Sequence, residues 1–386
     1  MKPIRVGIIG LGPKTNTFGP GLWAVQAHLP CLQASPHYQV VAVANSTIES
    51  AQRSIASHNL PPTTAAYGSA SDLAADPNVD LVVVSVRIQK HFELAQAAIQ
   101  HGKHIFVEWP LGATLAESTQ LAQLARDAGV KTIVGAQARA SRVVLAVKQI
   151  LASGKLGRVL SSHVLANTCL LPVDQWWEGY EFYLDMQSGG NEFYIHFGHF
   201  LDSFVDVLGG FETLQAGLHV QWPDVPIVSL QTGEVVRKEY RRTAPDTIMV
   251  QGRLESGAVA SISFRHSKAS VDFTGVKWVI SGTEGEMEVV FPEMLGDSSS
   301  QWQTANPGAK VVVRVGRETK AEEVDLDELV GPLDEELKGL EPVALNTGLV
   351  YSAFARGDEW RYATFETALK THELLTRIVK AAGWDV

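Results

Sequence analysis

The N-terminal part of the chain alternates short apolar runs with longer amphipathic segments, and this order constrains the fold more than any other feature. Runs rich in β-branched residues predict strands at Val6–Gly10, Val40–Ala44, Leu81–Val86, His104–Val107 and Lys131–Gly135. The segments between them repeat apolar residues at helical intervals, at Trp23–Ser35, Ile48–His58, His91–His101 and Leu115–Asp127. Strands that alternate with helices predict a doubly wound parallel sheet, which binds ligands at the carboxyl ends of its strands.

The pattern changes near Ser153. Alternating apolar and polar residues predict antiparallel strands with one buried face, at Val159–Asn167, Thr247–Glu255, Ala258–His266, Lys277–Ser281 and Gly285–Phe291. Helical periodicity returns at Phe193–Leu208 and again from Phe365 up to Gly383. We therefore expect an α/β protein of two domains: a Rossmann domain over residues 1–136, and a domain for substrate and oligomerisation over residues 137–386, which has an open, mostly antiparallel sheet and a C-terminal helix that packs back.

Composition narrows the class of protein. The 386 residues are 45% hydrophobic and 19% charged, which is typical of globular chains. The net charge of -10 has the wrong sign for direct binding of nucleic acid, and no apolar run approaches the roughly 20 residues that span a membrane. Cys31 and Cys169 are too few for a disulfide framework. We expect a cytoplasmic protein, or a nuclear one if it regulates genes.

A glycine-rich turn follows the first predicted strand. Gly10 and Gly12 stand where the Rossmann fingerprint allows a tight turn and a close approach to a pyrophosphate. The third glycine of the fingerprint is displaced to Gly19 or Gly21, so the loop is longer than usual. Additional donors to phosphate are Lys14, Thr15 and Asn16. The alternative is that these glycines only turn the chain.

The end of the second predicted strand bears on the choice of nucleotide. An acidic residue there normally binds the ribose hydroxyls of NAD, whereas this chain has Asn45, Ser46 and Thr47. Neutral donors tolerate a 2′-phosphate better, which favours NADP, with NAD as the alternative cofactor. An equally good interpretation is that Asn45 caps the next helix.

Two segments carry a resemblance to a known family. The run HGKHIFVEWP at residues 101–110 resembles the GKHVxxEKP segment of the Gfo/Idh/MocA oxidoreductases, and Gly189-Gly190-Asn191 with His199 and Asp202 resembles their GGG…H…D segment. The resemblance implies NAD(P)-dependent oxidation or reduction of sugars, inositols or related polyols. It also implies a homodimer or higher homo-oligomer that forms through the C-terminal sheet.

This chain departs from the family pattern at two positions. Trp109 replaces the lysine that assists proton transfer in the family, and Ile195 replaces an aspartate. With these departures the chain resembles one branch of the family, the galactose-regulon repressors, which bind NADP and control a transcription activator by binding it. The resemblance implies that the nucleotide site also includes Ser85, Val86, Arg87, His91, Glu108, Trp109, Pro110 and Arg139.

His199 is the leading candidate for acid/base chemistry, because a neutral imidazole exchanges protons near pH 7. Asp202 is expected to orient it, and His196 and Tyr194 add further polar groups to the candidate catalytic set. The alternative for His199 is a core histidine with its hydrogen bonds satisfied. No third ligand accompanies the two histidines, so no metal is expected.

Aromatic residues and one lysine are the candidates for substrate contact. Aromatic rings can stack on a nicotinamide or on the apolar face of a sugar, although core packing explains any one of them equally well. Solvation at the surface is the alternative for the lysine. The candidates are Trp176, Tyr180, Tyr183 and Lys277.

The sequence leaves two functions open. The favoured one is an NAD(P)-dependent oxidoreductase that acts on a sugar-like or polyol-like small molecule at a site that lacks the usual lysine. The alternative is a non-catalytic, NADP-binding regulator whose partner is a transcription activator.

Overall fold

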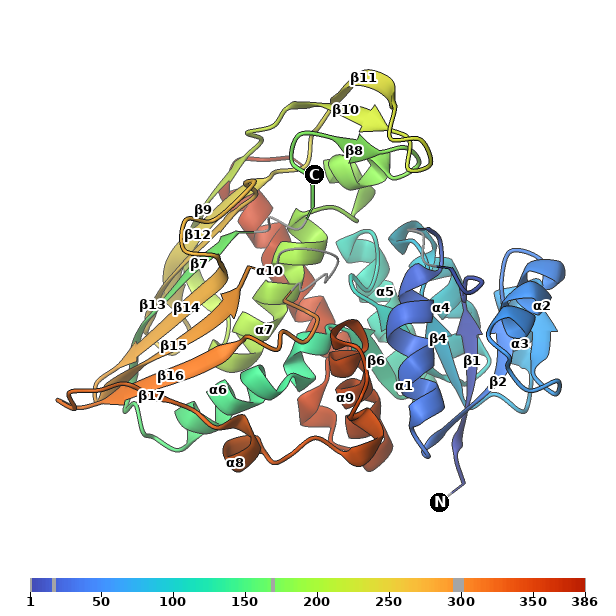
Figure 1. The fold of residues 1–386 in the computed structure, drawn as a ribbon, viewed down its shortest axis with the longest axis horizontal. Coiled ribbons are helices and arrows are strands. Elements are labelled where there is room, and N and C mark those ends of the chain that lie inside the picture. Colours follow the sequence, from blue (N-terminus) through green and yellow to red (C-terminus); the bar gives the residue numbers. More distant parts are fainter. Residues whose placement is uncertain (1, 16–18, 168–170, 294–301, 386) are drawn as a thin grey trace. The chain divides into compact units, whose positions relative to one another are not determined.

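The computed structural model describes residues 2–15, 19–167, 171–293 and 302–385, which form two compact units (Figure 1). The first unit consists of Met1–Ala140 and Asp334–His372, and the second of Ser141–Leu333 and Glu373–Val386. The chain thus leaves the first unit once and returns to it near the C-terminus. The single boundary expected after residue 136 does not include this return.

Six parallel strands form the sheet of the first unit, in the order β3-β2-β1-β4-β5-β6. They are β1 (Ile4–Ile9), β2 (Tyr38–Ala44), β3 (Ala65–Tyr67), β4 (Leu81–Val84), β5 (His104–Glu108) and β6 (Thr132–Gly135). β1 pairs with β2 on one side and with β4 on the other. The strand order therefore changes direction beside β1, at the point where doubly wound sheets bind ligands. The predicted Rossmann sheet is confirmed.

Three helices of the first unit begin at hydroxyl caps, which explains where they start. Thr47, Ser69 and Thr114 each accept a hydrogen bond from a backbone amide of the first turn. The helices are α1 (Leu29–Ala34), which follows a π-helical turn over Ala24–His28, α2 (Ile48–Ser57), α3 (Ala70–Ala75), α4 (His91–Gln100), α5 (Leu115–Ala128) and α9 (Pro342–Arg356). The sequence prediction lacked β3 and α3, because segments this short show too little periodicity.

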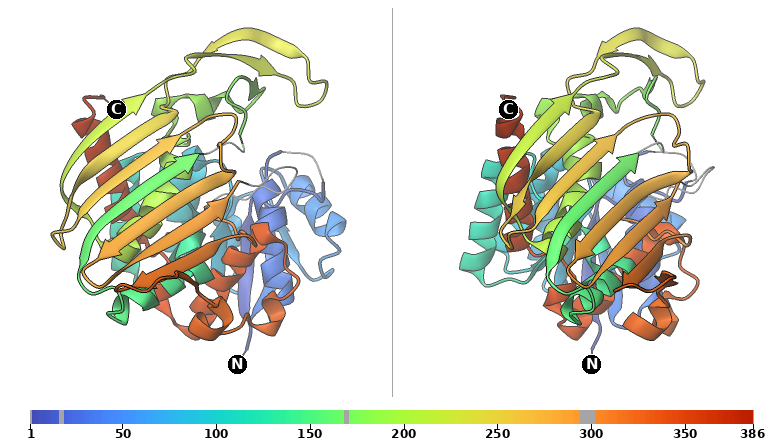
Figure 2. Two further views of the ribbon diagram at one scale, coloured as in Figure 1. Left: turned by 60° about the vertical axis from the view of Figure 1, so that its left-hand side comes forward. Right: turned by 90° about the vertical axis from the view of Figure 1, so that its left-hand side faces the viewer.

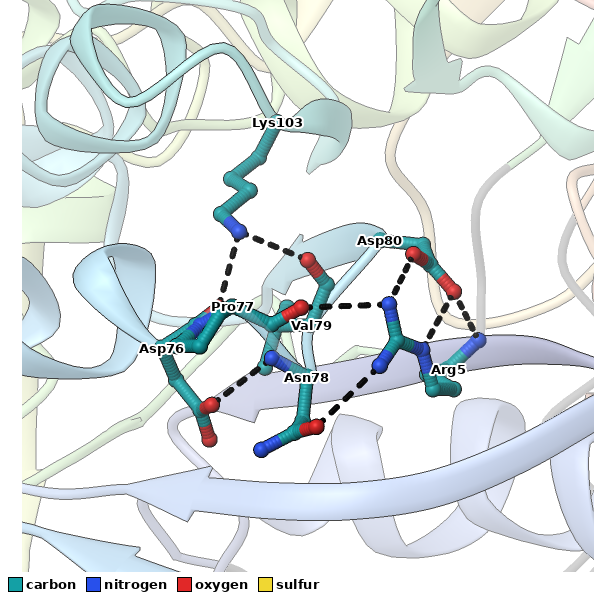
Figure 3. A network of polar contacts seen from close by, with 7 residues as sticks. All are labelled: Arg5, Asp76, Pro77, Asn78, Val79, Asp80 and Lys103. Atoms are coloured by element: carbon teal, nitrogen blue, oxygen red, sulfur yellow. Dashed lines mark hydrogen bonds and ion pairs between the residues drawn. The ribbon is translucent and has the colours of Figure 1, made fainter.

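A polar network joins segments at the amino ends of β1, β4 and β5 (Figure 3). The guanidinium of Arg5 contacts both carboxylate oxygens of Asp80, at 2.7 and 2.9 Å. The ammonium of Lys103 donates to the carbonyl oxygens of Asp76 and Val79, at 2.8 Å each. The hydrogen bond from Arg5 lowers the pKa of Asp80. This end of the sheet has a structural role, which leaves the carboxyl ends for ligands.

Eight strands form the large sheet of the second unit, in the order β17-β16-β15-β14-β7-β13-β12-β9. They are β7 (Val159–Asn167), β9 (Phe211–His219), β12 (Thr247–Leu254), β13 (Val259–Arg265), β14 (Thr274–Gly282), β15 (Gly285–Pro292), β16 (Lys310–Val315) and β17 (Glu322–Glu323). Neighbouring strands run antiparallel except β7 and β13, which are parallel. The prediction of a mostly antiparallel sheet is confirmed.

One face of this sheet packs against helix α7 (Gly198–Leu208). The ring of Phe200 lies 5.3 Å from that of Phe264 and 5.6 Å from that of Trp278, and Phe204 also packs on Trp278. The remaining helices in this unit are α6 (Arg142–Ala152) and α8 (Leu326–Val330), and the division between the units falls within α10 (Phe365–Ala381). The expected helix over Phe193–Leu208 is present, but its first five residues are π-helical.

The opposite face of the sheet, which we call the outer face, carries apolar side chains that are exposed to solvent. Leu165, Met249 and Val259 are 50%, 54% and 53% exposed. Figure 2 turns this face toward the viewer, and among the described residues of the second unit no helix covers it. A small three-stranded sheet, in the order β11-β10-β8, consists of β8 (Trp176–Trp177), β10 (Asp224–Val228) and β11 (Val235–Arg241).

Candidate functional site

The loop after β1 is packed so closely that side chains have no room at its glycines. A Cβ atom at Gly10, whose φ is +95°, would lie 2.4 Å from the carbonyl oxygen of Ser85. At Gly12 it would lie 2.9 Å from the carbonyl oxygen of Pro20, and at Gly21, whose φ is +77°, 2.4 Å from the backbone nitrogen of Gly12. The loop therefore folds back on itself at the carboxyl ends of β1 and β4, as a pyrophosphate-binding turn requires.

Side chains from α2 and the residues around it hold this loop in place. Asn45 donates through Nδ2 to the carbonyl oxygen of Leu11 at 2.9 Å, and Ser54 donates to the same oxygen at 2.7 Å. A ring nitrogen of His58 lies 2.9 Å from the carbonyl oxygen of Gly12. The cap of α2 is Thr47, so the alternative that Asn45 caps this helix is wrong: its amide reaches back to the loop instead.

The remaining candidates near the loop differ in exposure. Lys14 and Ser46 are exposed, and Thr15 is half-buried. The backbone amide of Lys14 donates to the hydroxyl of Ser57 at 3.1 Å, and the residue is exposed. Asn16 lies outside the described residues.

His91 connects the segments that follow β4 and β5. Its Nδ1 lies 2.8 Å from the carbonyl oxygen of Pro110, and its Nε2 lies 3.1 Å from that of Val86. Burial lowers the pKa of His91, and a neutral ring can donate to only one of these two oxygens. In the same two segments, Ser85 and Trp109 are buried and Arg87 is exposed. The Trp109-Pro110 peptide bond is cis. His91 thus orders the two strand ends that flank the candidate nucleotide site.

A buried polar network surrounds Glu108 at the end of β5. One carboxylate oxygen lies 2.8 Å from Nε2 of His28, and Gln137 donates to both oxygens at 3.2 and 3.0 Å. Nδ1 of His28 lies 2.8 Å from the hydroxyl of Tyr351 in α9. Glu108 therefore binds protein groups and holds the turn that carries Trp109. Arg139 is buried in the adjoining turn over Gln137–Ala140.

In the second unit, Asn191 determines where the helix with the catalytic candidates begins. Its side-chain oxygen accepts hydrogen bonds from the amides of Phe193 and Tyr194 at 3.1 and 3.2 Å, while its Nδ2 donates to the carbonyl oxygen of Asp185 at 2.9 Å. The π-helical turn over Phe193–Phe197 follows, with the amide of Phe197 bound to the carbonyl oxygen of Glu192 at 3.1 Å. Such turns are frequent at functional sites.

Tyr183, Glu192 and His196 form a compact polar cluster beside this turn. The hydroxyl of Tyr183 donates to Oε2 of Glu192 at 2.7 Å and also contacts Nδ1 of His196. That nitrogen lies 3.4 Å from Oε2 of Glu192, four residues earlier on the same helix face. The ring of Trp176 stacks on that of Tyr183, with centroids 4.7 Å apart. Two predicted site residues, His196 and Tyr183, are thus brought together.

The other catalytic candidates lie deeper. His199 and Asp202 are 4% and 0% exposed on α7. Burial, helped by the nearby His196, lowers the pKa of His199 to about 3. Tyr194 is also buried, which raises its pKa to about 12. These values keep His199 neutral and Tyr194 protonated at neutral pH, and a base with so low a pKa is weak.

Two of the substrate candidates, Lys277 and Tyr180, contact other protein side chains. Lys277 points to the outer face of the sheet, because residues on a strand alternate in direction and its neighbour Trp278 points to α7. Its ammonium lies 2.9 Å from a carboxylate oxygen of Glu288. Lys277 is therefore on the side of the sheet away from His199. Tyr180, half-buried, packs against the apolar cluster around Trp176.

The comparisons with known proteins follow this division into units. Residues 4–136 match the model of the oxidoreductase family with an NAD-binding Rossmann fold, and residues 142–290 match the model of the Gal80p C-terminal domain. The dehydrogenase aclE of Aspergillus oryzae is 30% identical over 391 residues, which cover 99% of this chain and 96% of that protein. The chain belongs to the Gfo/Idh/MocA oxidoreductase family.

Other members of the Gfo/Idh/MocA family that match this chain differ in role. The galactose/lactose metabolism regulatory protein GAL80 of Kluyveromyces lactis is 27% identical over 75% of this chain and 64% of that protein. The crystal structure of a super-repressor mutant of Gal80p from Saccharomyces cerevisiae has the same fold, with a TM-score of 0.83 at 20% identity over 99% of this chain and 96% of that one. Further relatives are named as sugar or inositol reductases and dehydrogenases.

Within this Gfo/Idh/MocA member, sequence reasoning missed several residues of the two candidate sites. Glu192 had a detectable signal, because a carboxylate four residues before a histidine shares its helix face. His28 and Tyr351 had none, since they come from opposite ends of the chain. No group of three or more potential metal ligands occurs among the described residues, and no described helix is long and apolar enough to cross a membrane.

Proposed function

We propose that this Gfo/Idh/MocA family member is an NAD(P)-dependent oxidoreductase that acts on a sugar-like or polyol-like small molecule. The closed glycine loop at the carboxyl ends of β1 and β4 carries the proposal, because a nucleotide pyrophosphate needs this close backbone approach. When bound, a nicotinamide nucleotide accepts or supplies a hydride. The residues proposed to hold it, or to order the backbone around it, are Gly10, Gly12, Lys14, Thr15, Asn45, Ser46, Ser85, Val86, Arg87, His91, Glu108, Trp109, Pro110 and Arg139.

NADP is the proposed nucleotide. No carboxylate stands at residues 45–48, directly after β2, where Asn45 uses its amide to hold Leu11 and Ser46 is exposed. An acidic residue at this position would repel a 2′-phosphate, whereas the ammonium of Lys14 at the surface would attract one. Both features favour the phosphorylated nucleotide.

The proposed reacting groups come from the second unit. The expected set is His199 with Asp202, together with His196 and Tyr194; Trp176, Tyr180 and Tyr183 supply the aromatic surface for substrate. Lys277 is not part of this proposal, because it lies on the other side of the sheet.

Two measurements test the proposed function. The protein is titrated with NADP+ and separately with NAD+, and binding is monitored by tryptophan fluorescence. The Kd for NADP+ should be lower than the Kd for NAD+. The protein loaded with NADP+ is then incubated with a panel of sugars and polyols, and reduced nicotinamide is followed by absorbance. We expect turnover with at least one compound. Binding of several compounds without any turnover would argue against an enzyme.

Two observations favour a second function, that of a nucleotide-binding regulator. Trp109 cannot shuttle a proton as the family's lysine does, and the match of residues 142–290 to the Gal80p C-terminal domain points the same way. In that case the partner is a transcription activator and the nucleotide is a signal. Affinity purification from the source organism with and without NADP+ tests it: an activator recovered reproducibly supports this function, and recovery of none contradicts it.

We also propose that the chain forms a homodimer through the outer face of the large sheet. The face is broad and carries the exposed apolar residues Leu165, Met249 and Val259 on adjacent strands. Large apolar side chains exposed on an uncovered sheet face are typical of protein interfaces.

A further inference from the structure

In the cluster of Tyr183, Glu192 and His196, the structure indicates which group donates each hydrogen bond, which the sequence did not. Tyr183 donates its hydroxyl hydrogen to Glu192, at 2.7 Å, so its oxygen is left to accept. The atom that faces this oxygen is Nδ1 of His196. A neutral imidazole carries one proton, and the partner of one nitrogen decides which nitrogen holds it. The chain of contacts therefore places the proton on Nδ1 and leaves the lone pair on Nε2.

We propose that Glu192 and Tyr183 are positioning residues that hold His196 as the proton acceptor of the site, with Nε2 as the accepting atom. This inference rests on the proposed oxidoreductase function and deepens it. It transfers the acid/base role from His199, which is more deeply buried, to the neighbouring histidine. It also supplies a proton acceptor in a chain that has Trp109 and Ile195 at the family's lysine and aspartate positions.

The surroundings of His196 agree with this role. The charged or titratable groups that act on the cluster are Glu192 on its own helix, Tyr183 from the preceding segment, His199 one turn later and Arg242 near Tyr183. Burial and the nearby Glu192 raise the pKa of Tyr183 well above its usual range, so its hydroxyl remains a donor at working pH. His196 is 8% exposed, and no described residue hydrogen-bonds to its Nε2.

The proposed step balances as follows. In the oxidative direction the substrate hydroxyl gives its proton to Nε2 of His196, and the carbon–hydrogen bond breaks with its electron pair passing to the oxidised nicotinamide nucleotide. A carbonyl, a reduced nucleotide and a protonated His196 result. The proton on Nε2 then leaves to solvent, and Nδ1 keeps its proton throughout.

The first test reads the tautomer directly and needs no activity. The full-length protein, labelled with 15N-histidine, is examined at about pH 8 by long-range 1H–15N correlation, and the His196 signals are assigned by their loss in His196→Gln. We expect a protonated Nδ1 and an unprotonated Nε2. The opposite tautomer in the unmutated protein would overturn the proposal, whether or not turnover is found.

The second test separates positioning from simple support of the fold. Glu192→Gln, alone and combined with Tyr183→Phe, should shift His196 toward the Nε2-protonated tautomer, because Tyr183→Phe alone leaves the Glu192 carboxylate 3.4 Å from Nδ1. With NADP+ and a compound that turns over, both variants should lower kcat by about 10-fold and move the acidic limb of the pH profile, where the proton acceptor becomes protonated, while His196→Gln lowers kcat by about 100-fold. Tyr240 packs, like Tyr183, against the apolar cluster around Trp176, so Tyr240→Phe is the matched control. It should change neither the tautomer of His196 nor kcat nor the pH profile.

The outcomes distinguish this inference from the proposed function. An unchanged tautomer in both folded variants contradicts the positioning role. The expected tautomer without turnover on any compound leaves the cluster as proposed but contradicts the enzymatic function. If a variant fails to fold, the tautomer of the unmutated protein still decides.

Discussion

At the scale of single residues, Gly10 differs from most glycines with positive φ because both its conformation and its surroundings exclude a side chain. We expect Gly10→Ala to abolish nucleotide binding, since its Cβ would lie 2.4 Å from the carbonyl oxygen of Ser85. The matched control is Gly129→Ala, where φ is +64° but no atom lies within 4 Å. The control should lower the free energy of unfolding by about 1 kcal/mol and leave the Kd for NADP+ unchanged. Binding that survives in Gly10→Ala would contradict the assigned loop.

Glu108 is a residue whose loss should affect stability more than chemistry. Glu108→Ala leaves His28 and the amide of Gln137 buried without their partner. We expect the free energy of unfolding, measured in urea, to fall by about 1–3 kcal/mol, the cost of leaving buried polar groups without a hydrogen-bond partner. Lys277→Ala, which removes the exposed ion pair with Glu288, should change it by less than about 1 kcal/mol. Equal effects of the two variants would show that the Glu108 network is not structural.

At the scale of elements, the position of one helix start controls the candidate catalytic cluster. Asn191→Ala removes the cap that binds the amides of Phe193 and Tyr194, and should lower the free energy of unfolding by about 1–2 kcal/mol. Ser141→Ala removes the cap of α6 at a similar cost. Only Asn191→Ala should alter the 15N signals of His196. A cluster that is unaffected by Asn191→Ala would separate the helix start from the site.

At the scale of the whole molecule, buried histidines make stability depend on pH. Burial lowers the pKa of His199 to about 3 and that of His372 to about 4, whereas both titrate near 6.5 in an unfolded chain. The unfolded state therefore binds more protons, so the stability is fully present above about pH 6.5 and is lost as the pH falls through the acidic range, by about 1.4 kcal/mol per pH unit for each group. Urea titrations between about pH 7 and pH 5 should show this loss, and His372→Gln should reduce it. A slope that His372→Gln leaves unchanged would contradict the assignment.

The outer face makes a separate prediction about assembly. Met249→Asp and Leu165→Asp place a charge in the proposed interface and should convert a dimer into a monomer, as measured by light scattering after size-exclusion chromatography. Val271→Asp changes a side chain that is 99% exposed in the loop between β13 and β14, and should leave the dimer intact. A monomer in the unmutated protein would remove the proposed interface.

Much of the fold was predictable because its signals are local. Alternating apolar runs and helical stripes indicated five of the six strands in the first sheet, and glycines after β1 indicated the loop. Short elements such as β3 escaped detection, since three residues show no period. The candidate site was predictable in part: His196 and Tyr183 were named, but their partner Glu192 was not.

The sequence by itself determined the two kinds of sheet, the glycine loop and the family, because periodicity, turn residues and motifs lie within short stretches of chain. Only the tertiary structure decided which polar groups meet. His28 and Tyr351, 323 positions apart, join around Glu108 only after folding. Tyr183 contacts His196 because the Asn191 cap and the π-helical turn set the orientation of the helix. Lys277 points away from His199 because residues on a strand alternate in direction. Hydrogen bonds depend on distance and angle, which spacing along the chain does not specify.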